Sequence, residues 1–208
     1  MPIKLSIPAR APKIKEFYSS GSWKVPEGVT SIIVFAIAGG GGGGGAGGNQ
    51  SRGGNGGQTI ISGNISGVLL TLNGGIGGEV STPNIAGNAG LSYSGVAGPG
   101  HADNSIGALR YNFGSGSPFG GGGSATIGAQ GQGNNANGYG SGGSGAASSD
   151  AYNIRAAGGG SGQCALGVVL PVVPGETLSI TVGANGSPGN GNSRGGSGAP
   201  GFVRIIYF

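Results

Sequence analysis

The sequence predicts an all-β protein with glycine-rich regions and no substantial α-helix. In this fold a terminal β-sheet or sandwich core carries packed left-handed helices of the polyglycine-II type. Strand-length apolar segments cluster near the chain ends, 55 of 208 residues are glycine, and glycine recurs at every third position in two stretches. Glycine has no side chain, so a segment with this spacing lets a second backbone approach closely along one edge.

The strand signals fall into three parts of the chain, residues 16–38, 58–72 and 163–208. Residues 16–25 are expected to form a first strand with Gly21 as a bulge, and residues 29–38 form an apolar run typical of a central strand. Strict alternation of apolar and polar residues predicts a strand over 178–182. Further strands are predicted over 58–62, 68–72, 168–170 and 202–208.

Glycine spacing predicts how the rest of the chain packs. Seven consecutive glycines, Gly39 to Gly45, follow the central apolar run, and any spacing is trivially met there. The later stretch keeps a threefold spacing without such a run, so it carries the argument for a left-handed helix with three residues per turn. With only 11 prolines and short repeats, a collagen triple helix is disfavoured, and we expect several helices of one chain joined by backbone hydrogen bonds. The glycines of the later stretch are Gly186, Gly189, Gly195, Gly198 and Gly201.

The chain divides into an arm and one domain. Residues 1–15 contain three prolines and alternate basic with apolar residues, so we expect an extended arm that lies on the protein's own body or on a neighbouring subunit. Residues 16–208 are expected to form a single glycine-rich β domain. Residues 76–160 carry almost no strand signal, so we expect the terminal sheets to display this middle region as loops.

Charge and cysteine content argue against several classes of protein. Charged residues make up 8% of the chain and the net charge of +4 is scattered, so we expect no nucleic-acid partner. The single cysteine, Cys164, cannot form an internal disulfide, and no apolar run is long enough for membrane insertion. The chain opens with no secretion signal, so we expect it to be made in the cytoplasm.

Residues that could perform chemistry are few. His101 and Asp103 lie two positions apart, but the chain has no second histidine and no nearby cysteine to complete a metal site, so a surface loop is the simpler interpretation. Glu27 and Glu176 lie in turns that contain proline and glycine, which explains them structurally. We therefore expect no catalytic residue, no metal, no cofactor and no enzymatic activity.

Large side chains outside the strands provide the candidate recognition residues. Tyrosine offers a large amphipathic surface at low entropic cost, and arginine, histidine and asparagine add polar contacts. Alternatively, some of these side chains fill small local cores, a role that suits Phe113 and Phe119 because they lack a polar tip. The predicted receptor-binding residues are Tyr93, His101, Arg110, Tyr111, Asn112, Tyr139, Tyr152 and Arg155.

Three stretches resemble a known family. The stretch from Trp23 to Val34 with the glycine run after it, and the stretches 173–183 and 198–205, resemble the glycine-rich domain common in phage tail and tail-fibre proteins. The resemblance covers roughly residues 17–208. In composition the middle region is similar to the distal tail-fibre adhesins of T-even-like phages, in which stacked polyglycine helices carry loops that bind the host receptor.

The resemblance implies a non-enzymatic virion protein at the tip of a tail fibre or tail, acting as a receptor-binding adhesin for the bacterial host surface. Its arm would dock to a tail-fibre or baseplate protein, the receptor could be a protein or a glycan, and a homotrimer is one open arrangement. The main alternative is a purely structural tail, baseplate or capsid component without receptor binding. Ice binding is disfavoured, because residues 86–155 lack short threonine or alanine repeats in register.

Overall fold

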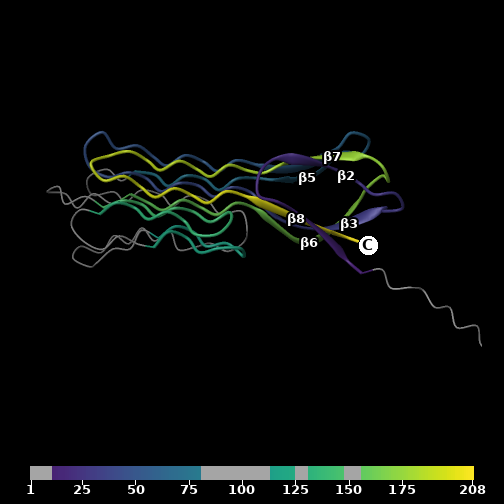
Figure 1. The fold of residues 1–208 in the computed structure, drawn as a ribbon. Coiled ribbons are helices and arrows are strands. Elements are labelled where there is room, and N and C mark those ends of the chain that lie inside the picture. Colours follow the sequence, from purple (N-terminus) through teal and green to yellow (C-terminus); the bar gives the residue numbers. More distant parts are fainter. Residues whose placement is uncertain (1–10, 81–112, 125–130, 148–155) are drawn as a thin grey trace, which may run out of the picture.

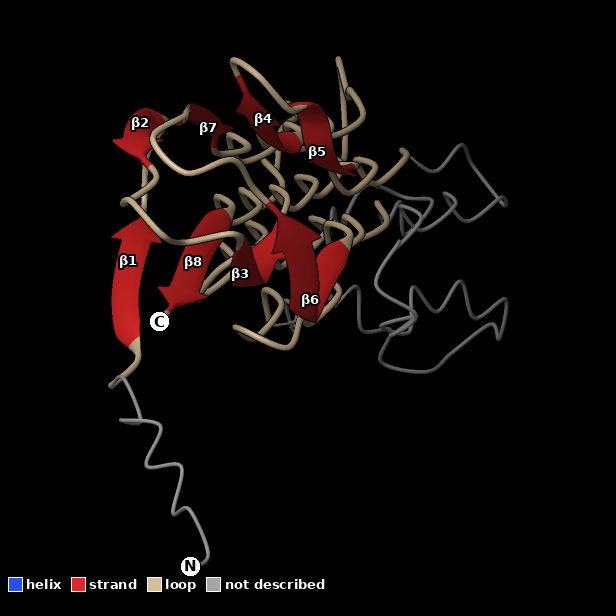
Figure 2. Ribbon diagram, turned by 90° about the vertical axis from the view of Figure 1, so that its right-hand side faces the viewer, coloured by secondary structure: helices blue, strands red, loops and turns tan. Residues whose placement is uncertain are grey.

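The computed structural model describes residues 11–80, 113–124, 131–147 and 156–208 and confirms the all-β class. Two antiparallel four-stranded sheets lie one above the other in Figure 2, and the described residues form no helix. None of these residues therefore belongs to a helix able to cross a membrane. The first sheet has the order β1-β8-β3-β6 and the second β2-β7-β4-β5. The strands are β1 (Lys13–Phe17), β2 (Gly21–Lys24), β3 (Ser31–Ile37), β4 (Thr59–Gly63), β5 (Gly67–Leu72), β6 (Cys164–Pro171), β7 (Thr177–Thr181) and β8 (Phe202–Tyr207).

A single hydrophobic core joins the two sheets. Ile32 and Val34 of β3 are buried in one cluster with Ile61 of β4 and Ile180 of β7. Strand β7 alternates exposed and buried residues, as its sequence pattern predicts, whereas β3 pairs with β6 on one side and β8 on the other. The central position expected for the apolar run after Val29 is therefore confirmed.

The single strand predicted over residues 16–25 is wrong, because the chain changes sheet within it. Strand β1 pairs with β8 in the first sheet, whereas β2 pairs with β7 in the second. Ser20 lies between them, and its Oγ accepts a hydrogen bond from the Val182 N–H at 3.0 Å, which fixes the crossing. Gly21 is the first residue of β2 rather than a bulge. Residues 13–15, predicted as part of the arm, belong to β1, and residues 1–10 lie outside the described residues.

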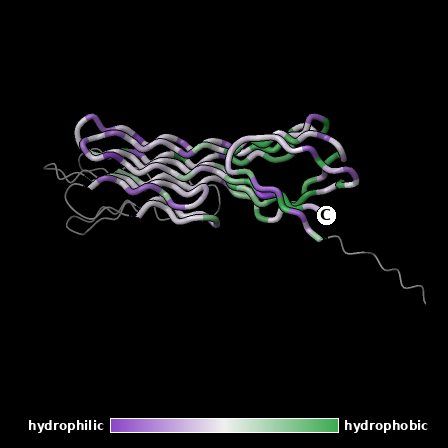
Figure 3. Tube along the Cα trace, in the orientation of Figure 1, coloured by the Kyte–Doolittle hydropathy of each residue, from purple (hydrophilic) through white to green (hydrophobic). Residues whose placement is uncertain are grey.

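Six strands continue directly into glycine-rich segments that lie side by side in one array (Figure 1). Apolar residues concentrate in the strands, and the array is mostly of intermediate hydropathy (Figure 3). Described parts of the middle region, 113–124 and 131–147, belong to the array through backbone hydrogen bonds rather than forming displayed loops. The segments continuous with strands are 39–46 after β3, 51–57 before β4, 73–80 after β5, 156–162 before β6, 183–190 after β7 and 193–201 before β8.

The segment 39–46 lies at the centre of the array. Its N–H groups donate in turn to the segments 51–57, 193–199 and 157–160, at 2.8–3.0 Å, and the partner segment repeats at every third residue. Gly39, Gly42 and Gly45, for example, all donate to 51–57. Carbonyl groups of the same segment accept from three further segments, 75–78, 143–146 and 186–189. Backbone thus surrounds this segment on all sides.

This enclosure explains the run of seven glycines. A Cβ added to Gly40 or Gly43 would fall on the carbonyl oxygen of Ser141 or Ser144. A Cβ at Gly186 would lie 2.5 Å from the Gly42 nitrogen, so this residue of the later stretch also faces the centre. Flanking segments need glycine only where they face a neighbour, and their remaining positions carry side chains.

Side-chain amides end the backbone network at the edge of the array. Asn55 Oδ1 accepts a hydrogen bond from the Gly77 N–H at 3.0 Å. Gln132 Oε1 and Asn135 Oδ1, three residues apart, accept from the Arg194 and Ser197 N–H groups at 2.6 and 2.8 Å. An amide oxygen thus replaces the backbone carbonyl that a further neighbouring segment would supply. The threefold spacing of these amides in the sequence could have indicated this role.

Candidate functional site

The described residues that border the segments 81–112 and 148–155 lie at the end of the array opposite the sheets (Figure 1). The Ala157 N–H donates to the Glu79 carbonyl at 2.9 Å, and the Ala156 N–H donates to the Ala146 carbonyl at 3.0 Å. Ala146 itself donates to Gly44, near the end of the central segment. We call this region the distal end of the array.

Seven of the eight predicted receptor-binding residues lie in those two bordered segments, outside the described residues. Both segments join the described chain at the distal end, where the residues that border them are linked by backbone hydrogen bonds. The seven residues are Tyr93, His101, Arg110, Tyr111, Asn112, Tyr152 and Arg155.

The structure places Tyr139, the eighth, at the opposite end, where the array meets the first sheet. Its half-buried ring stacks on Phe202 at 5.1 Å between centroids and lies 5.7 Å from Tyr18. Phe119 meets the same Phe202 ring edge-on at 5.9 Å. This packing favours a structural role for Tyr139. Of the two phenylalanines considered for local cores, Phe119 fits that role, whereas Phe113 is 41% exposed.

Replacing Tyr139 by alanine should lower the free energy of unfolding by about 1–2 kcal/mol, because two ring contacts are lost and each contributes roughly 0.5–1.5 kcal/mol. Tyr139→Phe keeps the ring and should remain within about 0.5 kcal/mol of the parent protein. Urea denaturation measures both variants. Equal stability of Tyr139→Ala and Tyr139→Phe would contradict a structural role for the Tyr139 ring.

Charged groups border this aromatic cluster on its exposed side. Arg204 lies over the Phe202 ring at 5.6 Å, and its guanidinium approaches Glu16 Oε1 at 2.7 Å. The Tyr18 hydroxyl donates to Glu16 Oε2 at 2.6 Å. The Tyr18 hydrogen bond and the Arg204 guanidinium lower the pKa of Glu16. These side chains are in contact with solvent, so we assign them to positioning Phe202 rather than to stability.

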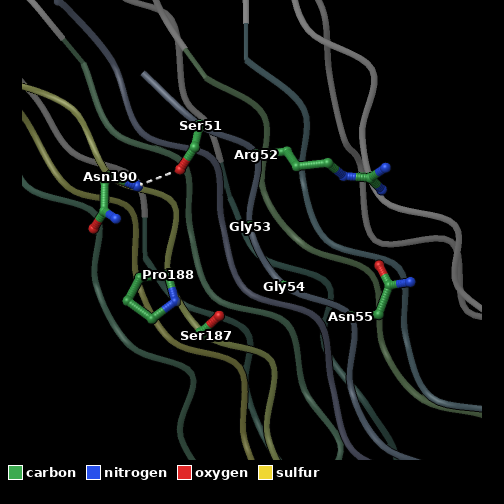
Figure 4. Close-up of a pocket in the computed structure, with 8 residues that line it drawn as sticks. All are labelled: Ser51, Arg52, Gly53, Gly54, Asn55, Ser187, Pro188 and Asn190. Carbon is green, nitrogen blue, oxygen red and sulfur yellow. Dashed lines mark hydrogen bonds between the residues drawn. The ribbon is translucent and has the colours of Figure 1, made fainter. Parts of the chain in front are cut away.

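An open groove of about 430 Å³ runs along the side of the array between segments 51–57 and 183–190 (Figure 4). The Asn190 N–H donates to Ser51 Oγ at 2.9 Å across it, and the Arg52 side chain extends away from that contact. No local sequence pattern indicates this groove, because its two walls are far apart in the chain. Its lining residues are Ser51, Arg52, Gly53, Gly54, Asn55, Ser187, Pro188 and Asn190.

The buried carboxylate Glu176 has a structural explanation. Val173 N–H and Ser66 Oγ donate to its Oε1, both at 2.7 Å, which joins the β6–β7 turn to the β4–β5 turn. Burial alone would raise the pKa of Glu176, but the hydrogen bonds from Val173, Ser66 and Ile65 outweigh it and lower the pKa. The Glu176 carboxylate therefore links the two turns through hydrogen bonds.

Other reactive groups are isolated in the described part of the chain. No group of three or more histidine, cysteine, aspartate or glutamate residues there could hold a metal ion. Cys164 is a free thiol at the start of β6, and burial raises its pKa. The thiol is therefore less ionised, and less nucleophilic, than an exposed cysteine.

No protein-family model matches the chain, and no curated protein matches it at a significant level.

Proposed function

We propose that the protein is a virion protein of a phage tail fibre or tail tip, a non-enzymatic adhesin that presents loops to a receptor on the bacterial host surface. In the fold that we propose, a β-sandwich carries packed left-handed helices of the polyglycine-II type. The threefold repeat of partners along 39–46 supports this helix type, because three residues per turn direct successive N–H groups to three neighbours.

The observation that carries the proposal is the separation of the two ends. The sheets lie at one end of the array, and the segments 81–112 and 148–155 join it at the other. Every residue of the central segment bonds to a neighbouring segment, so bending the array would break hydrogen bonds to several neighbours at once. A stiff support reduces the ordering entropy that displayed loops lose on binding.

Recognition is assigned to the seven predicted residues in the two distal segments, and Tyr139 is left to packing at the sheets. Tyrosine, arginine and histidine side chains suit a protein or a glycan receptor. No cofactor or metal is needed for this role. The sheet end, with the residues that precede β1, would attach to a tail-fibre or baseplate protein, as a monomer or homotrimer in the virion.

The decisive experiment replaces three distal tyrosines together, Tyr93→Ala, Tyr111→Ala and Tyr152→Ala. Fluorescently labelled protein should bind host cells about 100-fold more weakly, because interface tyrosines often contribute 2 kcal/mol or more. Flow cytometry of labelled cells measures the change, and competition with particle adsorption tests whether the same receptor is used.

The matched control replaces exposed apolar residues at the sheet end, Ile65→Ala and Val68→Ala, which are 64% and 70% exposed. This control should bind cells like the parent protein. If the folded tyrosine variant binds cells unchanged, the adhesin proposal fails. A purely structural component would be indicated instead by two results together: phage particles fail to assemble without the protein, and particles with the tyrosine variant adsorb normally.

A further inference from the structure

The first sheet has one face in the core, and its opposite face carries a row of apolar residues beside the Glu16–Arg204 ion pair. Ile14 pairs with Ile206, Ile206 with Ile33, and Ile33 with Val169, so one row of apolar residues crosses all four strands. Directly paired residues lie on the same face of a sheet, with Cβ atoms about 4.5–5.5 Å apart. Ile14 and Val169, at the two ends of the row, are 59% and 63% exposed.

Among the described residues, the chain covers this face near the array. There, Phe202 lies under the rings of Phe119 and Tyr139, and Gly140 approaches Ile37 so closely that a Cβ would meet its side chain. The row from Ile14 to Val169 lies farther along the strands, beyond this cover. Leu166, 55% exposed, extends the apolar surface towards the cover.

The uncovered surface matches a peptide better than a second folded domain. Its apolar residues number only six, whereas a stable interface between folded proteins takes about 20–30 residues from each side. Neighbouring strands lie about 4.8 Å apart, so the row of four paired residues is about 14 Å long. The six residues are Ile14, Ile33, Phe35, Leu166, Val169 and Ile206.

We propose that the N-terminal segment of the same chain covers this surface, with Ile3, Leu5 and Ile7 packed along the row. The described chain begins at Ala11, three residues from Ile14, at one end of the row. In residues 3–7, apolar and polar residues alternate strictly, and an extended segment of this length spans about 14 Å between its first and last residues.

Geometry and linkage favour the chain's own segment over that of a second copy. Ile7 precedes Ile14 by seven residues, enough to turn from β1 across the strands. In the proposed arrangement Ile3 would then lie near Val169. Such a short tether gives an effective concentration in the millimolar range. Lys4 and Ser6 then face away from the sheet, so the attachment end presents a basic outer surface. The proposed packing of residues 3–7 does not depend on whether the protein binds a receptor.

Disulfide trapping tests the proposal in the full-length protein with Cys164→Ser. Ile3→Cys combined with Val169→Cys should form an intramolecular disulfide under mild oxidation at micromolar protein concentration. The control combines Ile3→Cys with Val68→Cys, which is similarly exposed but lies on β5 of the second sheet. We expect at least tenfold faster cross-linking at Val169, measured by mass spectrometry of the linked peptides.

Two outcomes would overturn the proposal: equal cross-linking at Val169 and Val68, or a Val169 disulfide found mainly between two chains. The second would assign the surface to another copy. A variant pair without cysteines gives an independent measurement. Leu5→Lys should raise the binding of an apolar dye several-fold and lower the melting temperature, whereas Ser6→Lys should change neither. Identical behaviour of the two lysine variants would also contradict the proposal.

Discussion

Replacing Gly43 by alanine should destabilise the protein by about 3 kcal/mol or more, the upper range for overpacking a core. The added Cβ would fall on the carbonyl oxygen of Ser144, a backbone atom that cannot turn aside like a side chain. Moving that backbone would also strain the bond from the Gly196 N–H to the Ser144 carbonyl. The free energy of unfolding from urea denaturation measures the loss.

Gly121→Ala is the matched control for this substitution. Gly121 is exposed, and a Cβ added there meets no atom within 4 Å. Its stability should stay within about 0.5 kcal/mol of the parent protein. If Gly43→Ala were as stable as Gly121→Ala, close approach of backbone would not be the reason for glycine in the central segment.

Replacing Glu176 by glutamine should lower the free energy of unfolding by about 2–3 kcal/mol, because a buried donor left without an acceptor is costly. The carboxylate accepts from the Val173 N–H and from both the N–H and the hydroxyl of Ser66. A glutamine side chain would turn its NH₂ group towards at least one of these donors. Glu27→Gln, an exposed residue in a similar turn, should change stability by less than about 0.5 kcal/mol.

Stability should also depend on pH through Glu176. Its pKa is lowered from the ordinary value of 4.5, so below that pH the unfolded chain binds this proton more readily than the folded one. The contribution is therefore present above pH 4.5 and is lost as the pH falls through the lower folded pKa. Between pH 6 and pH 3, the free energy of unfolding from urea denaturation should fall less for Glu176→Gln than for the parent protein. An equal fall in the two proteins would contradict this assignment.

Local sequence patterns predicted most strands because alternation and apolar runs reflect which face of a strand is buried. Strand β7 and the central β3 are examples. The change of sheet at Ser20 was missed, because it depends on a contact with Val182 that no local pattern indicates. Glycine spacing likewise identified Gly186 as facing another backbone, but the identity of that backbone, at Gly42, is set by long-range packing.

Candidate site residues were harder to predict for the same reason. Tyr139 is an isolated aromatic residue among glycines, which suggests a displayed side chain. Its partner Phe202 is distant in sequence, and only the fold brings the two rings together. The end-to-end arrangement of sheets and array was predictable in part, because strands and glycine blocks already alternate along the chain.

The enclosure of segment 39–46 has a consequence for biosynthesis. Gly43 completes its hydrogen bonds only with Gly196, which leaves the ribosome 153 residues after it. Contacts so distant in sequence form slowly, and the apolar β3 must wait for β6 and β8 before its edges are paired. A stop codon shortly before Gly196 would therefore deprive segment 39–46 of neighbours, and the nascent chain would depend on chaperones until residues 193–199 emerge.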